Sequence, residues 1–194
     1  MTNATELCFG SHAAGDPAYA RYHDTEWGRP VHGETALFER LCLEGFQVGL
    51  SWRTVLGKRD AFREAFAGFD PARVAAFGAA DVDRLMGDSR LIRNQAKIWA
   101  CVRGAAIVEA MHVAGETLDA LIWSAQPAHH PRPQLAGRAT QSPGSAALAR
   151  ELHRRGFRFV GPVNVYATLQ ACGVINDHIV GCAAGDEIAA AARG

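Results

Sequence analysis

The two ends of the chain each carry a cysteine and a histidine, and this pairing constrains the fold more than any other feature of the sequence. Cys8 and His23 lie near the start, and His178 and Cys182 lie near the end. The second pair is spaced so that both side chains would share one face of a helix. Two thiolates and two imidazoles make a closed tetrahedral zinc site. Such a site would clip the chain ends together, and one structural Zn²⁺ per chain is expected because protein ligands fill every position.

Each pair on its own is weak evidence for a metal site. A capped core cysteine beside a surface histidine also explains His178 and Cys182, and the interval between Cys8 and His23 is loose. The predicted metal site therefore depends on the two pairs together. An odd, scattered set of cysteines is a poor disulfide framework. Apolar helical patterns around the remaining cysteines predict small core residues at Cys42, Cys101 and Cys172.

The rest of the chain is patterned as helices with short connections. No run of alternating apolar residues predicts a strand. Asp70-Pro71 and Ser142-Pro143 each place an N-cap residue before a proline at the first helical position. We expect an all-α fold of about eight helices. The segment 126–144, which contains four prolines, is the main irregular stretch.

Composition and charge exclude several classes of protein. With 48% hydrophobic and 21% charged residues, the chain is globular rather than disordered. No apolar run approaches the ~18 residues that span a bilayer, and the N-terminus lacks a basic-then-apolar signal pattern. A cytoplasmic location without membrane attachment is therefore expected. A formal net charge of +0 argues against non-specific coating of nucleic acid.

Glu44 lies on the apolar stripe of its predicted helix, at helical spacing from Leu37 and Leu41. A carboxylate that faces a core is costly unless it is paired or poised for chemistry. It either caps backbone N–H groups near Ser51 as a structural residue or belongs to a functional site. We favour the functional site because two glycines and the aromatic Trp52 follow it.

Four aromatic residues accompany this carboxylate. Flat rings beside a carboxylate suit a pocket for a flipped, cationic base, because rings stack on the base and attract its positive charge. Aromatic residues at helical spacing are also typical of core packing, which is the favoured interpretation for Tyr19 alone. The candidate pocket residues are Tyr19, Tyr22, Trp27 and Trp52.

A polar turn at 88–94 separates two helical stretches and is followed by Lys97. A tight turn that opens a helix presents backbone N–H groups to a phosphate, and Arg93 and Lys97 would add positive charge. A plain connection with surface bases explains the same residues.

Four blocks of residues occur together between Cys8 and about Cys182. They are Tyr22-His23-Asp24 with Glu26-Trp27-Gly28, Leu43-Glu44-Gly45 with Gly49-Leu50-Ser51-Trp52, Gly156-Phe157 with Phe159-Val160-Gly161, and Asn176-Asp177-His178 with Cys182. In these blocks and their order, the chain resembles the 3-methyladenine DNA glycosylase I family, a divergent branch of the helix-hairpin-helix glycosylases. The resemblance covers nearly the whole chain.

The resemblance implies base-excision repair of alkylated double-stranded DNA. It implies a hydrolase that flips 3-methyladenine out of the helix, cleaves its N-glycosidic bond and releases the free base. No lysine nucleophile stands out in the sequence, so we expect a monofunctional enzyme without a lyase step. Glu44 would be catalytic and would bind the base with Tyr22, while Trp27 and Trp52 shape the pocket. Leu50 would wedge into the duplex. The metal ligands implied are Cys8, His23, His178 and Cys182.

The same resemblance predicts the domain organisation. Residues 1–194 would form a single unit with a helix-hairpin-helix near 81–110, and the terminal segments would form a zinc-binding subdomain. We expect a monomer with no obligate protein partner. A non-catalytic, zinc-stabilised DNA-binding module is the alternative, and Glu44 and Trp52 in the pocket block argue against it. A zinc hydrolase would need an open metal position, which four protein ligands do not leave.

Two positions depart from the family's usual residues. Gly10 stands where a tryptophan is usual, with Phe9 beside it, so one wall of the pocket depends on whether Phe9 takes its place. Arg90 stands where the hairpin usually has a glycine. The turn then either stays within ordinary backbone angles or accepts local strain. We expect the Arg90 side chain to reach a DNA phosphate, together with Arg93 and Lys97.

Overall fold

The structure is a computed structural model of the chain, and it describes residues 8–10, 15–134 and 139–192. Within these ranges the regular structure is helical and contains no strand, as predicted. The helices outnumber the roughly eight expected, because glycines and prolines divide the segment 52–87 into short helices. Their bounds are α2 Pro17–Thr25, α3 Glu34–Gln47, α4 Trp52–Leu56, α5 Arg59–Ala65, the 3-10 helix η2 Ala67–Phe69, α6 Pro71–Ala75, α7 Ala79–Gly87, α8 Gln95–Val113, α9 Leu118–Trp123, α10 Pro143–Arg155, α11 Pro162–Ala171 and α12 Ala183–Ala191.

The predicted helix boundaries at Asp70 and Ser142 are confirmed. The Asp70 side chain accepts a hydrogen bond from the backbone N–H of Arg73, and α6 begins at the next residue. Ser142 caps α10 in the same way, and Gly156 ends that helix with a φ of 106°. Both helices therefore begin and end where local chemistry satisfies the backbone groups that a helix end leaves free.

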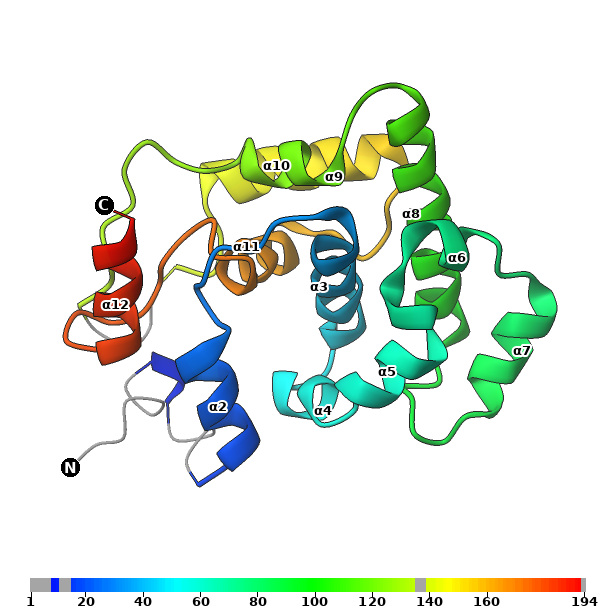
Figure 1. Cartoon of the computed structure of the whole chain (residues 1–194), viewed down its shortest axis with the longest axis horizontal. Coiled ribbons are helices and arrows are strands. Elements are labelled where there is room, and N and C mark those ends of the chain that lie inside the picture. Colours follow the sequence, from blue (N-terminus) through cyan, green and yellow to red (C-terminus); the bar gives the residue numbers. More distant parts are fainter. Residues whose placement is uncertain (1–7, 11–14, 135–138, 193–194) are drawn as a thin grey trace.

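Helix α3 is the centre of the fold (Figure 1). It packs against α11, α4, α9, α8 and η2, and its side chains Leu37, Phe38, Leu43 and Phe46 are almost completely buried. The Phe46 ring packs at a tilt against Phe62 of α5, with ring centres 4.5 Å apart. The central position of α3 explains why its final turn can present Glu44 from within the protein.

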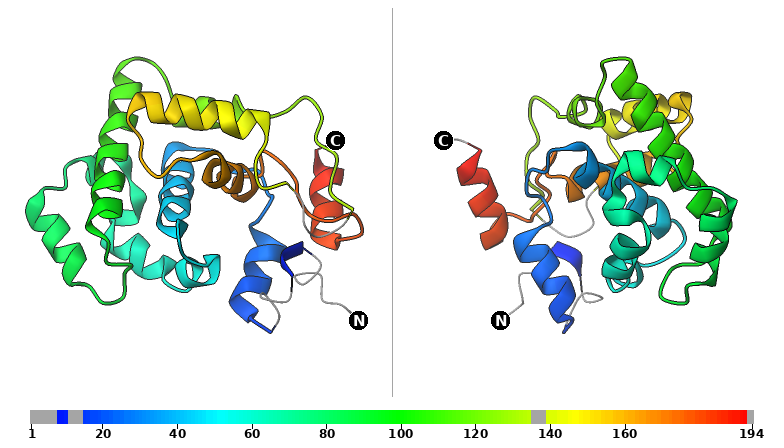
Figure 2. Two further views of the ribbon diagram at one scale, coloured as in Figure 1. Left: turned by 180° about the vertical axis from the view of Figure 1, so that it is seen from behind. Right: turned by 45° about the vertical axis from the view of Figure 1, so that its right-hand side comes forward.

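Helix α8 carries the predicted apolar stripe into the core. Ile98, Cys101, Val102, Ala105 and Val108 are all buried, and the helix packs along α6 and α7. The view from behind in Figure 2 shows α8 and α10 on the face that is turned away in Figure 1. The three cysteines predicted to be core residues are buried and unpaired.

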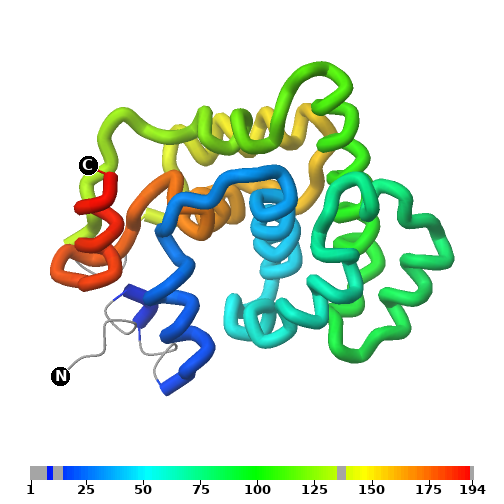
Figure 3. The backbone as a smooth tube through the Cα atoms, in the orientation of Figure 1, coloured from blue at the N-terminus to red at the C-terminus, as the bar shows by residue number. Residues whose placement is uncertain are grey.

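The beginning and end of the described chain meet at one side of the molecule. Helix α12 contacts α2, and the tube in Figure 3 shows the chain returning to α2 after passing through every other helix. Helices α5 to α8 lie at the opposite side (Figure 1). Among the described helices, none has the length and apolar character needed to cross a membrane.

Candidate active site and metal centre

A cavity of about 390 Å³ lies between α2, α3, α4 and α11. This volume falls in the range of small-molecule pockets. The four aromatic candidates from the sequence line it together with Glu44, which places the aromatic cluster and the carboxylate in one site. The lining residues are Phe9, Tyr19, Tyr22, Trp27, Glu44, Gln47, Trp52, Ala139, Thr140, Val163, Tyr166, Ala167 and Gln170.

Glu44 is the buried carboxylate of this cavity. It lies in the last turn of α3 and is 4% exposed. Its Oε2 atom has no hydrogen-bond partner among the described residues, and its backbone carbonyl is fixed by the Asn164 side chain at 2.9 Å. Burial raises the pKa of Glu44 to about 8. A cation in the cavity would favour the ionised carboxylate, so the site is suited to a positively charged ligand.

Aromatic rings form the walls around this carboxylate. The rings of Tyr22 and Trp52 have centres 5.3 Å apart. Phe9 lies 4.5 Å from Trp27 and nearly parallel to Tyr22, at 18° and 6.4 Å. Phe9 thus contributes a ring to the pocket beside Gly10. Burial, and then the neighbouring Glu44, raise the pKa of Tyr22, which keeps its phenol protonated and able to donate.

One face of α11 contributes a pocket wall that the sequence reasoning missed. Val163, Tyr166, Ala167 and Gln170 follow the i, i+3, i+4, i+7 spacing of a single helix face. Two polar-tipped residues on an otherwise apolar stripe were the available signal. Asp177, which does not line the cavity, holds Tyr166 and Gln170 by hydrogen bonds.

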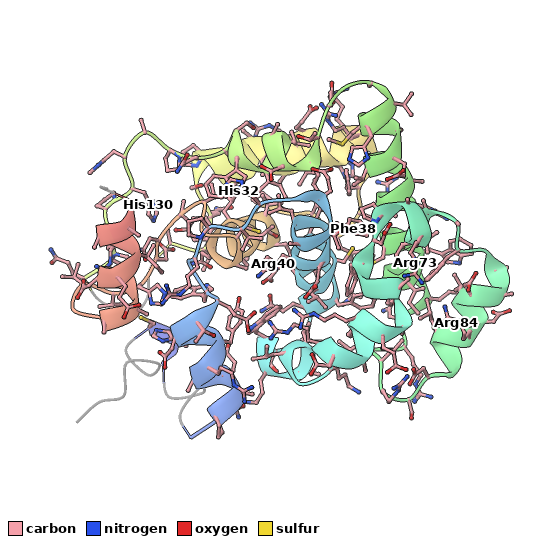
Figure 4. All side chains as sticks on the ribbon, viewed as in Figure 1. His32, Phe38, Arg40, Arg73, Arg84 and His130 are labelled. Atoms are coloured by element: carbon pink, nitrogen blue, oxygen red, sulfur yellow. The ribbon has the colours of Figure 1, made fainter. Side chains whose placement is uncertain are left out.

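Asp177 is 2% exposed and accepts three side-chain hydrogen bonds. The donors are Tyr166 Oη at 2.7 Å, Gln170 Nε2 at 2.7 Å and His130 Nε2 at 2.6 Å. His130 is labelled beside α12 in Figure 4. Because an ionised carboxylate only accepts, Gln170 must direct its amide nitrogen toward Asp177, and its carbonyl oxygen is left for other partners.

A bidentate ion pair joins the end of α2 to the start of α5. Arg59 donates from Nη1 and Nη2 to the two carboxylate oxygens of Glu26, at 2.6 and 2.8 Å. Glu26 directly precedes Trp27, so this pair fixes the chain where one pocket wall begins. Arg40, labelled in Figure 4, donates from α3 to the carbonyl of Ala171 at the end of α11.

The four predicted metal ligands come together and are all buried. The Sγ of Cys182 lies 3.6 Å from Nε2 of His23 and 3.3 Å from Nδ1 of His178. The Sγ of Cys8 lies 3.7 Å from the same His178 nitrogen. The four ligand atoms lie within 4.8 Å of one another, so this cluster could hold a metal ion.

The other ring nitrogen of each histidine is held by a hydrogen bond. His178 Nε2 donates to the carbonyl of Trp27 at 2.9 Å, and His23 Nδ1 donates to Asp24 at 2.7 Å. Burial lowers the pKa of His178 to about 4, which keeps the imidazole in its neutral, ligating form. Through Trp27, the cluster also supports a wall of the cavity.

Leu50 and the basic residues assigned to DNA contact lie in different environments. Leu50 is 43% exposed in the turn after α3. Arg93 is exposed and pairs with no group in the described part of the chain. Lys97, in contrast, is buried and donates to the carbonyls of Phe46 and Val48.

The Arg90 guanidinium is held by two carboxylates, Asp88 and Glu64, each at 2.8 Å. Its φ angle is not positive, so the turn stays within ordinary backbone space, the first of the two alternatives. A phosphate contact by Arg90, predicted from the sequence, would compete with these two ion pairs.

Comparisons with known proteins agree with this fold and site. The Methyladenine glycosylase family model matches residues 12–185. The chain is 45% identical over 170 residues to DNA-3-methyladenine glycosylase 1 of Escherichia coli (strain K12), covering 86% of this chain and 91% of that protein.

Two solved structures are also closely similar. A crystal structure of 3-methyladenine DNA glycosylase I superimposes with a TM-score of 0.86 and 42% identity, covering 91% of this chain and 98% of that one. A Staphylococcus aureus structure described as the structural basis of 3-methyladenine recognition gives 0.86 and 34%, covering 95% and 98%. The all-helical fold and its aromatic pocket are those of a base-excising glycosylase. The chain belongs to the methyladenine glycosylase family.

Proposed function

We propose that this chain excises 3-methyladenine from alkylated double-stranded DNA and leaves an abasic site. The names of its relatives support this activity, and a solved relative is described as recognising 3-methyladenine. The single observation that carries the proposal is the buried, unpartnered carboxylate of Glu44 inside an aromatic cavity. An inert DNA-binding module has no use for such a costly arrangement.

The chemistry follows from the charge on the lesion. Methylation at N3 makes the adenine cationic, so it is a good leaving group without strong protonation. The flipped base would stack between the rings of the pocket, and their electron-rich faces attract the cation. The ionised form of Glu44, favoured by that cation, would stabilise the positive charge of the base and of the sugar in the transition state.

Water completes the reaction. Its oxygen attacks C1′ of the sugar while the bond from C1′ to the base breaks. The bonding electron pair moves onto the ring and neutralises it, and a proton from the water is released. Free 3-methyladenine and an abasic sugar result, with Glu44 in a position to orient the water. None of the described residues that line the pocket is a lysine, so we propose a monofunctional hydrolase without a lyase step.

We assign Zn²⁺ to the cluster of Cys8, His23, His178 and Cys182. Zinc bonds of about 2.3 Å to sulfur and 2.0–2.1 Å to nitrogen place ligand atoms of a tetrahedron about 3.6 Å apart. The observed sulfur–nitrogen distances are 3.3, 3.6 and 3.7 Å. The zinc would be structural, joining the terminal segments into a subdomain that braces Trp27.

We assign DNA engagement to the turn after α3 and to the hairpin between α7 and α8. Leu50 would enter the base stack in place of the flipped nucleotide. Residues 88–94 with their flanking helices would form the helix-hairpin-helix. Its Arg93 has no partner among the residues that the structure describes. We further propose that the protein is a monomer, which sedimentation at micromolar concentration would test, and that it is cytoplasmic, which cell fractionation would test.

The test of the activity is direct. The protein is incubated with methylated duplex DNA, and the released bases are separated by chromatography. We expect free 3-methyladenine, with abasic sites but no enzyme-made strand breaks. Binding of the DNA without any base release would favour the non-catalytic alternative.

A further inference from the structure

Lys97 is a buried cation placed at the C-terminal end of α3. It projects from the first turns of α8 and is 7% exposed. Its ammonium group donates to the carbonyl of Phe46 at 2.8 Å and to the carbonyl of Val48 at 2.5 Å. The same group lies 5.8 Å from the centre of the Phe159 ring. Two of the three N–H donors of the ammonium are thus used by backbone carbonyls, and the side chain is almost completely buried.

These contacts complete the hydrogen bonding at the end of α3. The last carbonyls of a helix have no partners within it, and they must be satisfied by other groups. The other three carbonyls of this turn receive hydrogen bonds from the amides of residues 48 and 50 and from Asn164. The carbonyls of Phe46 and Val48 receive theirs from Lys97. A cation here also interacts favourably with the negative end of the helix dipole.

The segment that Lys97 holds leads directly into an exposed apolar tip, residues 48–50. Val48 is 39% exposed and Leu50 is 43% exposed, and Gly49 between them has a φ of 78°. A free turn of this kind would have to be ordered when it enters DNA, and ordering a residue costs conformational entropy. Fixing the carbonyls on both sides of Gln47 removes much of that freedom in advance.

We propose that Lys97 is a positioning residue for DNA opening: it holds the apolar tip in the conformation that enters the duplex, and it does not contact a phosphate. This inference rests on the proposed function, because it assumes that Leu50 wedges into the base stack. To reach a phosphate, the ammonium would have to leave two buried carbonyls unpaired, which is unfavourable.

The experiment compares the wild-type protein with Lys97→Met, which keeps the length of the side chain and removes its donors. A duplex carrying a tetrahydrofuran abasic analogue beside 2-aminopurine reports opening of the stack by fluorescence. We expect the fluorescence rise to be lost and excision from methylated DNA to fall about tenfold or more. Binding of free 3-methyladenine, followed by quenching of tryptophan fluorescence, should not change, because Lys97 does not line the base-binding cavity.

The salt dependence of duplex binding separates the two roles of a lysine. A phosphate contact makes the log-log slope shallower by about one unit when it is removed. We expect Lys97→Met to keep the wild-type slope and the matched control Arg93→Met to lose about one unit. A shallower slope with normal fluorescence in Lys97→Met would overturn the positioning role.

A double mutant tests whether Lys97 acts through the tip. Once Leu50→Ala has removed the wedge, adding Lys97→Met should cause little further loss of excision. If Lys97→Met lowers the excision rate by the same factor with and without Leu50, the two residues act independently and the proposal is overturned. If Lys97→Met does not bind the free base, Lys97→Arg takes its place in the fluorescence assay. Arginine keeps N–H donors for the two carbonyls, so the positioning role predicts a retained signal. A lost signal in a folded Lys97→Arg variant would contradict the proposal. Failure of the wild-type protein to release 3-methyladenine would instead contradict the proposed function.

Discussion

Glu44 and Trp52 line the same cavity, and each carries a buried polar atom that has no hydrogen-bond partner among the described residues. These atoms are the carboxylate Oε2 of Glu44 and the indole Nε1 of Trp52. Glu44 offers an acceptor once ionised, and Trp52 offers a donor. Unsatisfied buried polar groups are rare because each one costs free energy of folding. Their occurrence together in one pocket indicates a site that is prepared for a polar ligand.

The raised pKa of Glu44 predicts how excision depends on pH. If the ionised carboxylate stabilises the lesion, kcat/KM should rise with pH and level off above about 8, the pKa of Glu44 before substrate binds. The bound cation lowers that pKa, so kcat should level off at a lower pH. Stopped-time assays from pH 5.5 to 9 measure both profiles. A flat kcat/KM profile across this window would contradict the assignment.

The same pKa predicts how stability depends on pH. The folded protein keeps the Glu44 proton up to about pH 8, whereas the unfolded chain loses it near pH 4.5. Between these values the folded state binds the extra proton, so this group makes stability fall by about 1.4 kcal/mol per pH unit. Glu44→Gln lacks this effect. Its free energy of unfolding relative to wild type should therefore rise from pH 5 to pH 8 in denaturant titrations, and a constant difference would refute the argument.

Removal of zinc should loosen both ends of the chain and leave the helical middle folded. The four proposed ligands come from the terminal segments, whereas α3 to α8 are held by their own apolar core. We expect about one zinc per chain by elemental analysis. Chelation should raise amide exchange in α2 and around 178–182, with little change in α8. A Cys182→Ala variant that still binds zinc and melts like the wild type would count against the site.

Arg93 and Arg90 provide a matched pair in the hairpin. Arg93 is unpaired in the described part of the chain, whereas Arg90 is bound by Asp88 and Glu64. Arg93→Ala should make the log-log salt slope of DNA binding shallower by about one unit, because one phosphate contact is lost. Arg90→Ala should change the slope less, since its charge is already neutralised locally. The reverse order would support the phosphate contact that the sequence predicts for Arg90.

Much of this site could be predicted because its signals are local. The N-caps at Asp70 and Ser142 act on neighbouring residues, and helical spacing alone places Glu44 on a buried stripe. The two Cys and His pairs lie far apart in sequence, but their joint chemistry allowed only one simple arrangement. Such patterns can be recognised from the sequence without knowledge of the tertiary contacts.

The missed features depend on contacts that a sequence pattern does not encode. One of the two partners of Arg90 is the distant Glu64 on α5, and Asp177 accepts a hydrogen bond from His130 of the irregular segment. Lys97 is a partial exception. It lies four residues before Cys101 and shares a helix face with it, which was a sign of burial. Its charge favoured a surface contact instead, because nothing in the sequence reveals the helix end that it caps.

The central claim, that the buried charge of Glu44 serves excision, is tested most directly by single-turnover release of 3-methyladenine from methylated duplex DNA. The wild-type protein and Glu44→Gln are compared at saturating enzyme, with folding of both checked by thermal melting at pH 7. We predict release by the wild type and a rate about a hundredfold lower in the variant, whose melting temperature is at least as high. An equal rate in a folded Glu44→Gln variant would contradict the account.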